Sequence, residues 1–501
     1  MRRLRALPLF VLLMAIAAAA MLVPAAHALA LGDHAVARAF GYSAILFGIL
    51  AAVLAIATAA NRSANLSRDH LLTMLATMTV LPLMLAVPFV QTAPGGSFFD
   101  AWWEMVSSLT TTGATLFAPR DLPPSLHLWR AEVGWMGGYF MLVMAMAVLA
   151  PMRLGGFEVY FAGGAGSGSA PADPIADPRG RIARAALILA PAWFGLTLAL
   201  WVGLLIAGDP PLLALIHAMS TLATSGITSL AGLAGAPSGI AGEMLIFLFL
   251  VPALSRRLWP GAGELRASAR LVEDPELRLA AVLVVAVALV LFLRHWLVTL
   301  DIAFLSEGGR LASALWGATF TALSFLTTTG FESSGWLAAR AWSGLDAPGL
   351  LMAGLAIFGG GVATTAGGVK LLRVYALIRH GERELDRLVH PSSIGGGGIA
   401  ARRLRREGAY IAWVFFMLFA MSIAVTMLAV SLAGLAFEPA TLLSIAALSN
   451  TGPLATISGQ GANVWSLLAP AAKIVLAVAM VLGRLETLAI IALFNSEFWR
   501  R

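Results

Sequence analysis

Apolar stretches of about 20 residues recur along the whole chain and constrain its fold more than any other feature. They include residues 9–29, 71–90, 136–150, 185–207, 279–300, 409–432 and 471–494. Stretches of this length cross the hydrocarbon core of a bilayer as helices. The chain of 501 residues is 59% hydrophobic and 12% charged, which leaves too few charges for the surface of a water-soluble protein. We therefore expect an all-α polytopic membrane protein.

The N-terminal end allows two interpretations. Three arginines within residues 1–5, a long apolar stretch and Ala26-His27-Ala28 resemble a secretory signal peptide. The apolar stretch is longer than the core of such a peptide, and a second apolar run, residues 39–60, follows at once. We therefore predict a transmembrane helical hairpin over residues 1–66.

The basic residues are distributed unevenly between alternate loops. Six segments, 1–7, 61–69, 151–184, 255–278, 370–408 and 497–501, hold 25 of the 33 lysines and arginines. Loops rich in Lys and Arg stay on the cytoplasmic side of a membrane protein. The net charge of +7 thus reflects topology and not nucleic-acid binding. The distribution predicts a multi-pass membrane protein with both termini in the cytoplasm and four excursions that cross the membrane and return.

Each excursion has a short polar segment in its middle. These four polar segments are residues 107–115, 220–228, 324–331 and 447–453. In each, a short apolar helix candidate leads into small hydroxyl or amide residues and then a glycine. The glycines are Gly113, Gly226, Gly330 and Gly452, spaced by 113, 104 and 122 residues. Repetition at this scale indicates one structural unit copied four times.

The physics of the polar segments favours a cation filter. Irregular backbone at membrane depth must be buried in protein or line a water-filled path. Glycine adopts positive φ readily, which lets successive carbonyls turn toward a common axis and replace the hydration shell of a K⁺ ion. The preceding helix points its negative C-terminal end at the same place. The alternative is a polar packing site between helices. One such segment alone favours that alternative, whereas four in matching positions favour the filter.

The sequence resembles the potassium-transporting membrane subunits of the Trk/Ktr/HKT superfamily, most closely the bacterial Trk type, over nearly the whole chain. The local matches lie at residues 100–115, 359–370 and 483–487. The resemblance implies four helix–pore-loop–helix repeats around one pore, in addition to the N-terminal hairpin. We expect these repeats at residues 67–155, 180–260, 275–392 and 405–501.

The resemblance also implies that backbone carbonyls just before each glycine contact K⁺. Carried over to this chain, they belong to Thr111, Thr112, Thr224, Ser225, Thr328, Thr329, Asn450 and Thr451. The chain departs from the family pattern at Ser225 and Ile227 in the second segment, and at Asn450 and Pro453 in the fourth. These departures weaken the prediction of strict selectivity for K⁺ over Na⁺ more than that of cation passage.

A glycine-rich loop, residues 359–370, interrupts the apolar run after Leu350. So many glycines cannot propagate a stable helix, and the pattern predicts a flexible break in the third repeat. The resemblance implies an intramembrane gate there that blocks the pore and moves on activation. The candidate gate residues are Gly359, Gly360, Gly361, Thr364, Thr365, Gly367 and Gly368. A close-packed glycine seam is the alternative. A phosphate-binding loop is excluded because the G-x-x-x-x-G-K-[ST] pattern and a preceding strand are missing.

Arg484 is a basic residue deep in the last apolar run. A charge at this depth is costly, so it must face a cavity or a partner. The resemblance implies a position near the pore, beneath the gate. The alternative is an ion pair with Glu486, although residues two apart on a helix point in different directions.

Three acids lie close to the polar segments. Asp100 and Glu104 belong to the first pore helix, and Glu332 follows Gly330. Acids at the outer mouth draw cations toward a pore. For Asp100, the N-cap of the helix is an equal alternative.

The predicted function is K⁺ uptake through a gated, channel-like pore. The alternatives are a symporter that couples K⁺ to Na⁺ or H⁺, and a less selective monovalent cation channel. Proton coupling favours a buried acid in a midplane helix, and the sequence shows no convincing one. The chain has no cysteine and no paired metal-ligand motif, so we expect no enzymatic activity and no organic cofactor, with K⁺ as the transported ion.

The resemblance extends to partners. It implies a homodimer surrounded by membrane lipid, and a separate cytoplasmic, nucleotide-binding regulatory subunit of the Trk type. The sequence carries no nucleotide-binding pattern of its own, so we expect any nucleotide control to belong to that subunit.

Overall fold

The computed structural model describes residues 8–58, 66–95, 97–152, 178–230, 232–261, 271–298, 308–344, 348–390, 408–457 and 464–485. Within these residues all regular elements are helical. Seven helical stretches are long and apolar enough to cross a membrane, or eight if the bent pair Trp336–Ser343 and Pro348–Phe358 forms one span. The seven are Leu9–Ala30, His34–Thr58, Asp69–Val90, Pro124–Leu149, Gly180–Ile206, Pro275–Arg294 and Ala409–Leu432. The prediction of an all-α polytopic membrane protein is confirmed.

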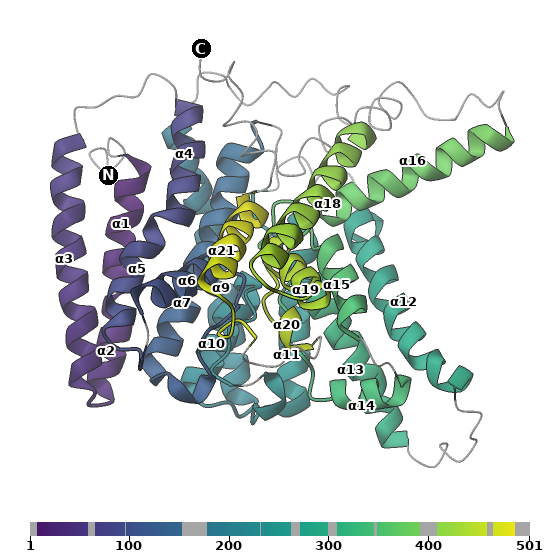
Figure 1. Cartoon of the computed structure of the whole chain (residues 1–501), viewed down its shortest axis with the longest axis horizontal. Helices are drawn as coiled ribbons and strands as arrows, with labels where there is room; N and C mark the ends of the chain where they lie inside the picture. Colours follow the sequence, from purple (N-terminus) through teal and green to yellow (C-terminus); the bar gives the residue numbers. More distant parts are fainter. Residues whose placement is uncertain are drawn as a thin grey trace.

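An N-terminal hairpin forms one edge of the molecule (Figure 1). Helices α1 (Leu9–Ala20) and α2 (Leu22–Ala30) run back along α3 (His34–Thr58). The chain reverses at Gly32, whose φ of 77° suits glycine, and the Asp33 side chain accepts a hydrogen bond from the N–H of Val36 at 3.2 Å. Large apolar side chains such as Ile56, which is 80% exposed, point away from the protein. In a membrane protein such side chains face lipid.

The remaining helices follow the order expected for four repeats. The first repeat has α4 (Leu66–Thr79), α5 (Leu81–Val90), pore helix α6 (Phe98–Leu109) and α7 (Pro124–Met144), and the second has α9 (Pro178–Ile206), pore helix α10 (Pro211–Ala223) and α11 (Gly239–Leu250). The third has α12 (Pro275–Val298), pore helix α13 (Gly308–Leu326), α14 (Trp336–Ser343), α15 (Pro348–Phe358) and α16 (Leu371–Val389). The fourth has α18 (Ala409–Leu432), pore helix α19 (Phe437–Leu448), α20 (Leu454–Ile457) and α21 (Pro470–Leu485).

The repeats pack in a closed cycle. The return helix of each repeat contacts the pore helix of the next, in the pairs α7 with α10, α11 with α13, α15 with α19, and α21 with α6. The last pair joins the fourth repeat back to the first. Elements far apart in sequence, such as the yellow α21 and the blue α6, therefore lie side by side at the centre of the molecule (Figure 1).

The return helices of the second and third repeats are shorter than a full crossing. Helix α11 has 12 residues and gives way to a 3₁₀ turn, Val251–Leu254, that contains Pro252. Helix α15 has 11 residues and ends where the glycine-rich loop begins. Proline and glycine end these two helices early. The early end of α15 lies at the break predicted for the third repeat, whereas the early end of α11 was not predicted.

Candidate functional site

All four pore helices end in the same backbone turn. The N–H of the residue before each glycine donates to the carbonyl five residues earlier. These bonds are Thr112 to Ser107 (2.9 Å), Ser225 to Ser220 (3.0 Å), Thr329 to Ser324 (2.9 Å) and Thr451 to Ala446 (2.8 Å). A second bond in each copy joins the preceding residue to the carbonyl three residues earlier. This pair of bonds defines a Schellman motif, so the polar segments begin as four copies of one helix end.

The left-handed residue of each motif is not a glycine. It is a threonine or an asparagine: Thr111 (φ 56°), Thr224 (51°), Thr328 (58°) and Asn450 (55°). A β-branched residue in this region is a genuine outlier that costs roughly 1–2 kcal/mol. Strained residues persist where the surrounding structure fixes them, and they cluster at functional sites. The four residues are among those that the sequence singled out, but their shared conformation has no sequence signal, because glycine is the usual residue at this position.

The four polar segments meet one another in a ring. A Cβ atom added to Gly113 would collide with the carbonyl of Ser225, and one added to Gly226 would collide with that of Thr329. A Cβ atom added to Gly330 would collide with Pro453, and one added to Gly452 would collide with the backbone of Ala114. Each segment thus contacts the next, and the fourth contacts the first. The structure brings together all twelve residues of the predicted filter.

The fourth segment departs from the symmetry of the other three. Gly113, Gly226 and Gly330 have φ of 72°, 66° and 80°, whereas Gly452 does not adopt positive φ. Its N–H donates instead to the Thr112 carbonyl at 2.7 Å. The Asn450 amide donates to the Thr112 hydroxyl at 3.0 Å and to the Met480 carbonyl at 2.9 Å. The expectation that every glycine turns the chain through positive φ is therefore wrong for this segment, where Pro453 and the Asn450 side chain supply other contacts.

The glycine-rich loop lies directly against the ring. All of its residues are buried except the half-buried Gly368. The Gly367 N–H donates to the Thr328 hydroxyl at 2.7 Å, and a Cβ on Gly367 would collide with the Ser449 carbonyl. On its other side, the loop is held by the second and third repeats. The Gly361 N–H donates to the Ala253 carbonyl at 2.9 Å, as the Thr364 hydroxyl does at 3.0 Å.

Buried charges hold the glycine-rich loop from both sides. The Val362 N–H donates to the Glu276 carboxylate, at the start of α12, at 2.8 Å. Arg484 of α21 donates to the Thr365 carbonyl at 2.6 Å, so its charge lies against the loop. The predicted alternative partner of Arg484, Glu486, lies outside the described residues.

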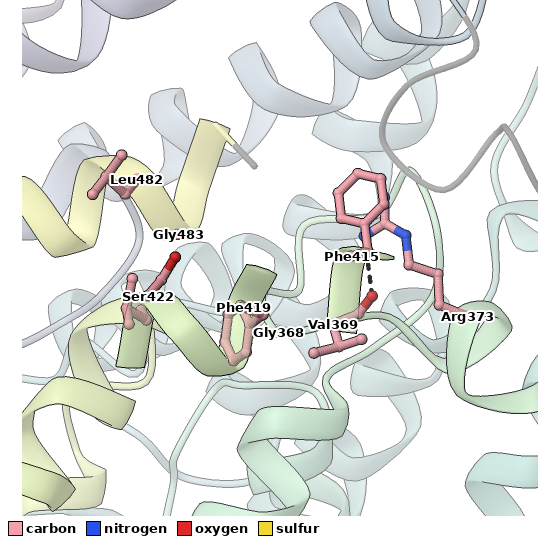
Figure 2. A pocket seen from close by; sticks show the side chains of 9 residues that line it. Gly368, Val369, Arg373, Phe415, Phe419, Ser422, Leu482 and Gly483 are labelled. Carbon is pink, nitrogen blue, oxygen red and sulfur yellow. Dashed lines mark hydrogen bonds between the residues drawn. The ribbon is translucent and has the colours of Figure 1, made fainter. Parts of the chain in front are cut away.

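A small cavity of about 20 Å³ lies where the glycine-rich loop joins α16 (Figure 2). It is lined by residues of the loop, α16, α18 and α21. Figure 2 shows the Arg373 side chain beside the Phe415 ring, with the guanidinium carbon 3.5 Å from the ring centre. The same guanidinium donates to the Val369 carbonyl at 3.1 Å. This cation–π contact ties the end of the loop to α18.

The predicted acids of the outer mouth have two different environments. Glu104 is fully buried, forms an ion pair of 2.6 Å with Arg130 and accepts a hydrogen bond from the Leu116 N–H at 2.9 Å. Its charge is neutralised, so the expectation that Glu104 draws cations is not supported. Asp100 forms an ion pair of 2.9 Å with Lys473 of α21. Asp100 is not the N-cap of α6 either, because the Ser97 hydroxyl takes that position.

Comparison with known proteins identifies the family. Residues 245–500, slightly more than half of the chain, match the sequence model of TrkH, described as a cation transport protein. The chain is 32% identical over 441 residues to the Trk system potassium uptake protein TrkH of Salmonella typhimurium, and the match covers 87% of this chain and 86% of the relative. The chain belongs to the TrkH family of cation transport proteins.

Other TrkH-family relatives agree. The chain is 31% identical over 449 residues to the Trk system potassium uptake protein TrkH of Escherichia coli K12, with 87% of this chain and 86% of the relative covered. The crystal structure of the potassium transporter TrkH from Vibrio parahaemolyticus superposes with a TM-score of 0.77 at 27% identity, over 99% of this chain and all of that one. The resemblance of the sequence to the Trk type is thereby confirmed.

Several buried acids in the described part of the chain were missed by the sequence reasoning, and Glu132 is the one among them that lacks a hydrogen-bond partner at Oε2. Glu132 lies in the middle third of α7, is 6% exposed, and its Oε2 has no hydrogen-bond partner. The expectation that no convincing acid is buried in a membrane helix is therefore wrong. Residues two apart on a helix point in different directions, and the packing shows that Arg130 pairs with Glu104 and not with Glu132.

Proposed function

We propose that this TrkH-family protein takes up K⁺ across the bacterial inner membrane through the ring of polar segments, which acts as its selectivity filter. The observation that carries the proposal is the fourfold Schellman motif with a left-handed residue at Thr111, Thr224, Thr328 and Asn450. Four helix ends that converge in one ring direct four negative dipole ends and a set of carbonyls at one place.

The proposed ion ligands are the backbone carbonyls of residues 111–112, 224–225, 328–329 and 450–451. The Thr112 carbonyl accepts a hydrogen bond from the Gly452 N–H. For K⁺ to pass, this carbonyl must give up that hydrogen bond and bind the ion instead. The membrane potential supplies about 2.3 kcal/mol per charge per 100 mV for inward movement. The names of the relatives, which are potassium uptake proteins, support K⁺ as the transported ion.

The proposed gate is the glycine-rich loop, together with Arg484. The loop is buried, contacts the third and fourth polar segments and is held by hydrogen bonds to Glu276 and Arg484. Ala363 and Lys370 of the loop adopt positive φ (53° and 85°), a strained conformation of the kind that clusters at switch regions. Its withdrawal from Thr328 would open the cytoplasmic side of the ring.

The test is cation flux into proteoliposomes of the purified protein, with K⁺, Rb⁺, Na⁺ and Li⁺ compared. The decisive variant is Gly113→Ser, whose added side chain meets the Ser225 carbonyl. Its matched control is Gly32→Ser, since Gly32 has nearly the same φ (77° against 72°) but open space around it. We expect K⁺ and Rb⁺ to be preferred in the wild type and in Gly32→Ser, and the preference to be lost in Gly113→Ser. Equal selectivity in all three would contradict the filter.

The same assay separates the coupled alternatives. A symporter moves K⁺ against its gradient when a Na⁺ or H⁺ gradient is imposed, whereas a channel-like pore follows the K⁺ gradient and the membrane potential alone. Uphill K⁺ movement that depends on a pH or Na⁺ gradient would replace the channel proposal with symport.

The assembly is proposed in the same way. We infer a homodimer with cytoplasmic termini that docks a nucleotide-binding regulatory subunit, as the Trk resemblance implies. Helix α16 supports a cytoplasmic docking role, because it extends from the helical body (Figure 1) and exposes Leu388 (80%) and Val389 (72%). Light scattering of the detergent-solubilised protein, corrected for bound detergent, tests the dimer.

A further inference from the structure

A second cavity lies between the N-terminal hairpin and the first two repeats. Its volume is about 1230 Å³, and residues of α1, α4, α5, α7 and α9 line it. The lining runs from Pro8, Asp69 and Ile182, near the starts of α1, α4 and α9, to Leu109 and Glu132. Cavities that hold a drug-sized ligand measure about 300–1,000 Å³, so this one has room for a ligand with a long apolar chain.

The cavity reaches the first polar segment at Leu109, but most of its α7 lining lies on another face than the one that contacts the ring. Gly134 and Gly137 lie on the ring side, where added Cβ atoms would meet the carbonyls of Ser108 and Leu109. Glu132, Met136 and Phe140, spaced by four residues, line the cavity from another face of the same helix. A ligand there would touch α7 without entering the proposed ion path, so its binding does not depend on the proposed function.

The chemistry of the lining points to a positively charged ligand. The ionisable lining residues are Asp69, His70, Glu132 and Tyr139, and the described lining includes no Lys or Arg. Glu132 is buried among apolar walls, and its Oε2 has no partner. A hydrocarbon chain alone would leave this carboxyl group without a hydrogen bond, which is costly in an apolar site.

Aromatic side chains of α7 line the cavity together with Glu132. Trp135 and Tyr139 line the cavity, while their polar atoms are bound elsewhere. The Trp135 indole donates to the Thr197 hydroxyl at 3.0 Å, and the Tyr139 hydroxyl donates to the Ala186 carbonyl at 2.7 Å. Both rings also pack against Trp193, with ring centroids at 5.8 and 5.7 Å, and they line the cavity beside that contact. Ring faces together with a carboxylate form the environment that recognises an ammonium ion.

We propose that this cavity binds a membrane-partitioned alkylamine, with its ammonium group at Glu132 and its hydrocarbon chain along the apolar walls of α1, α4 and α9. The ammonium group supplies the counter-charge and the hydrogen-bond donor that Glu132 lacks, and the chain fills the cavity. Recognition of this kind distinguishes an amine from an alcohol of the same chain length.

The test uses the full-length protein in phospholipid nanodiscs. A photoreactive diazirine derivative of dodecylamine is compared with the matching derivative of dodecanol, and the labelled peptides are mapped by mass spectrometry. In the wild type, we expect the amine to label α1, α7 and α9 at about tenfold lower concentration than the alcohol does. Equal labelling by the two probes overturns the proposal and identifies the cavity as space for neutral lipid chains.

Two variants sharpen the test. Glu132→Gln keeps the shape and removes the charge, so it should raise the concentration of amine needed for half-maximal labelling about tenfold and leave the alcohol unchanged. Ala76→Trp fills the cavity and should reduce labelling by both probes. Glu438→Gln removes an exposed acid of α19 outside the cavity and should change neither. Amine labelling unaltered by Glu132→Gln or by Ala76→Trp contradicts the site. If Glu132→Gln does not fold, the comparison of amine with alcohol in the wild type and the effect of Ala76→Trp still test the proposed amine site.

Discussion

The backbone N–H of Gly367 donates a hydrogen bond of 2.7 Å to the hydroxyl of Thr328, which links the glycine-rich loop to the third polar segment. The bond is buried, and Thr328 is one of the four left-handed residues of the ring. A residue whose carbonyl is a proposed ion ligand therefore also holds the proposed gate through its side chain. A hydrogen bond that substitutions can remove thus joins the proposed gate to the proposed filter.

The pair Thr328→Ala and Thr328→Ser tests this link. Both variants lose the methyl group, and only Ser keeps the hydroxyl that accepts from Gly367. Loss of a buried hydrogen bond costs about 1 kcal/mol, which is about fivefold in the population of the closed loop. We expect basal K⁺ flux in proteoliposomes to be about fivefold higher in Thr328→Ala than in Thr328→Ser. Equal flux in the two variants would show that the hydroxyl does not hold the gate.

Arg484 contributes both a hydrogen bond and a positive charge to the closed state. Arg484→Gln removes the charge and weakens the bond to the Thr365 carbonyl, so we expect K⁺ flux to rise at least about fivefold. Arg484→Lys keeps the charge, so its K⁺ flux should lie between that of Arg484→Gln and that of the wild type. Arg379→Gln, an exposed arginine of α16, serves as a charge-matched control that should change flux little. A fall in flux in Arg484→Gln would assign the arginine to ion passage instead of closure.

The Glu104–Arg130 ion pair is expected to stabilise the first repeat. Glu104→Gln leaves Arg130 buried without its counter-charge, which costs about 3–5 kcal/mol and lowers the melting temperature of the protein in detergent. Removing both charges, with Glu104→Gln and Arg130→Met together, should recover part of the loss.

The exposed pair Arg379–Glu382 supplies the comparison for that measurement. Glu382→Gln should cost less than about 1 kcal/mol, because solvent screens a surface pair. Equal melting temperatures for Glu104→Gln and Glu382→Gln would contradict the structural role of the buried pair.

We expect Glu332 to make cation entry sensitive to pH. It lies outside the seven long spans, two residues after Gly330, and burial raises its pKa to about 7, although Arg340 acts in the opposite direction. The carboxyl group is about 90% ionised at pH 8 and about 10% at pH 6. Because a negative charge near the ring attracts cations, K⁺ flux at low ionic strength should be higher at pH 8 than at pH 6.

The control for the pH effect is Glu332→Gln, which should show the lower flux at both pH values. High salt should reduce the difference in the wild type, because ions in solution screen the attraction between Glu332 and approaching cations. A pH dependence that persists unchanged in Glu332→Gln would assign it to another group.

The polar segments show how far the sequence carries a prediction. Their number, their glycines and their apolar lead-in helices were predicted because each is a local pattern within one repeat. The left-handed backbone at Thr111, Thr224 and Thr328 was not predicted, because threonine disfavours it and only the packing of four helix ends enforces it. Gly452 shows the reverse case, in which a glycine keeps an ordinary φ because its N–H bonds across the ring to Thr112.

The sequence by itself determined the membrane class, the helical hairpin, the fourfold repetition and the glycine-rich break, since hydropathy and composition depend on neighbours in the chain. The limits of the four repeats stay predictions. Tertiary structure decided which charges meet: Glu104 with Arg130, Asp100 with Lys473 and Glu276 with the glycine-rich loop. It also decided that Glu132 faces a cavity. Asp100 and Lys473 are joined across 373 positions, and contacts of this kind arise only when the cycle of repeats closes in space.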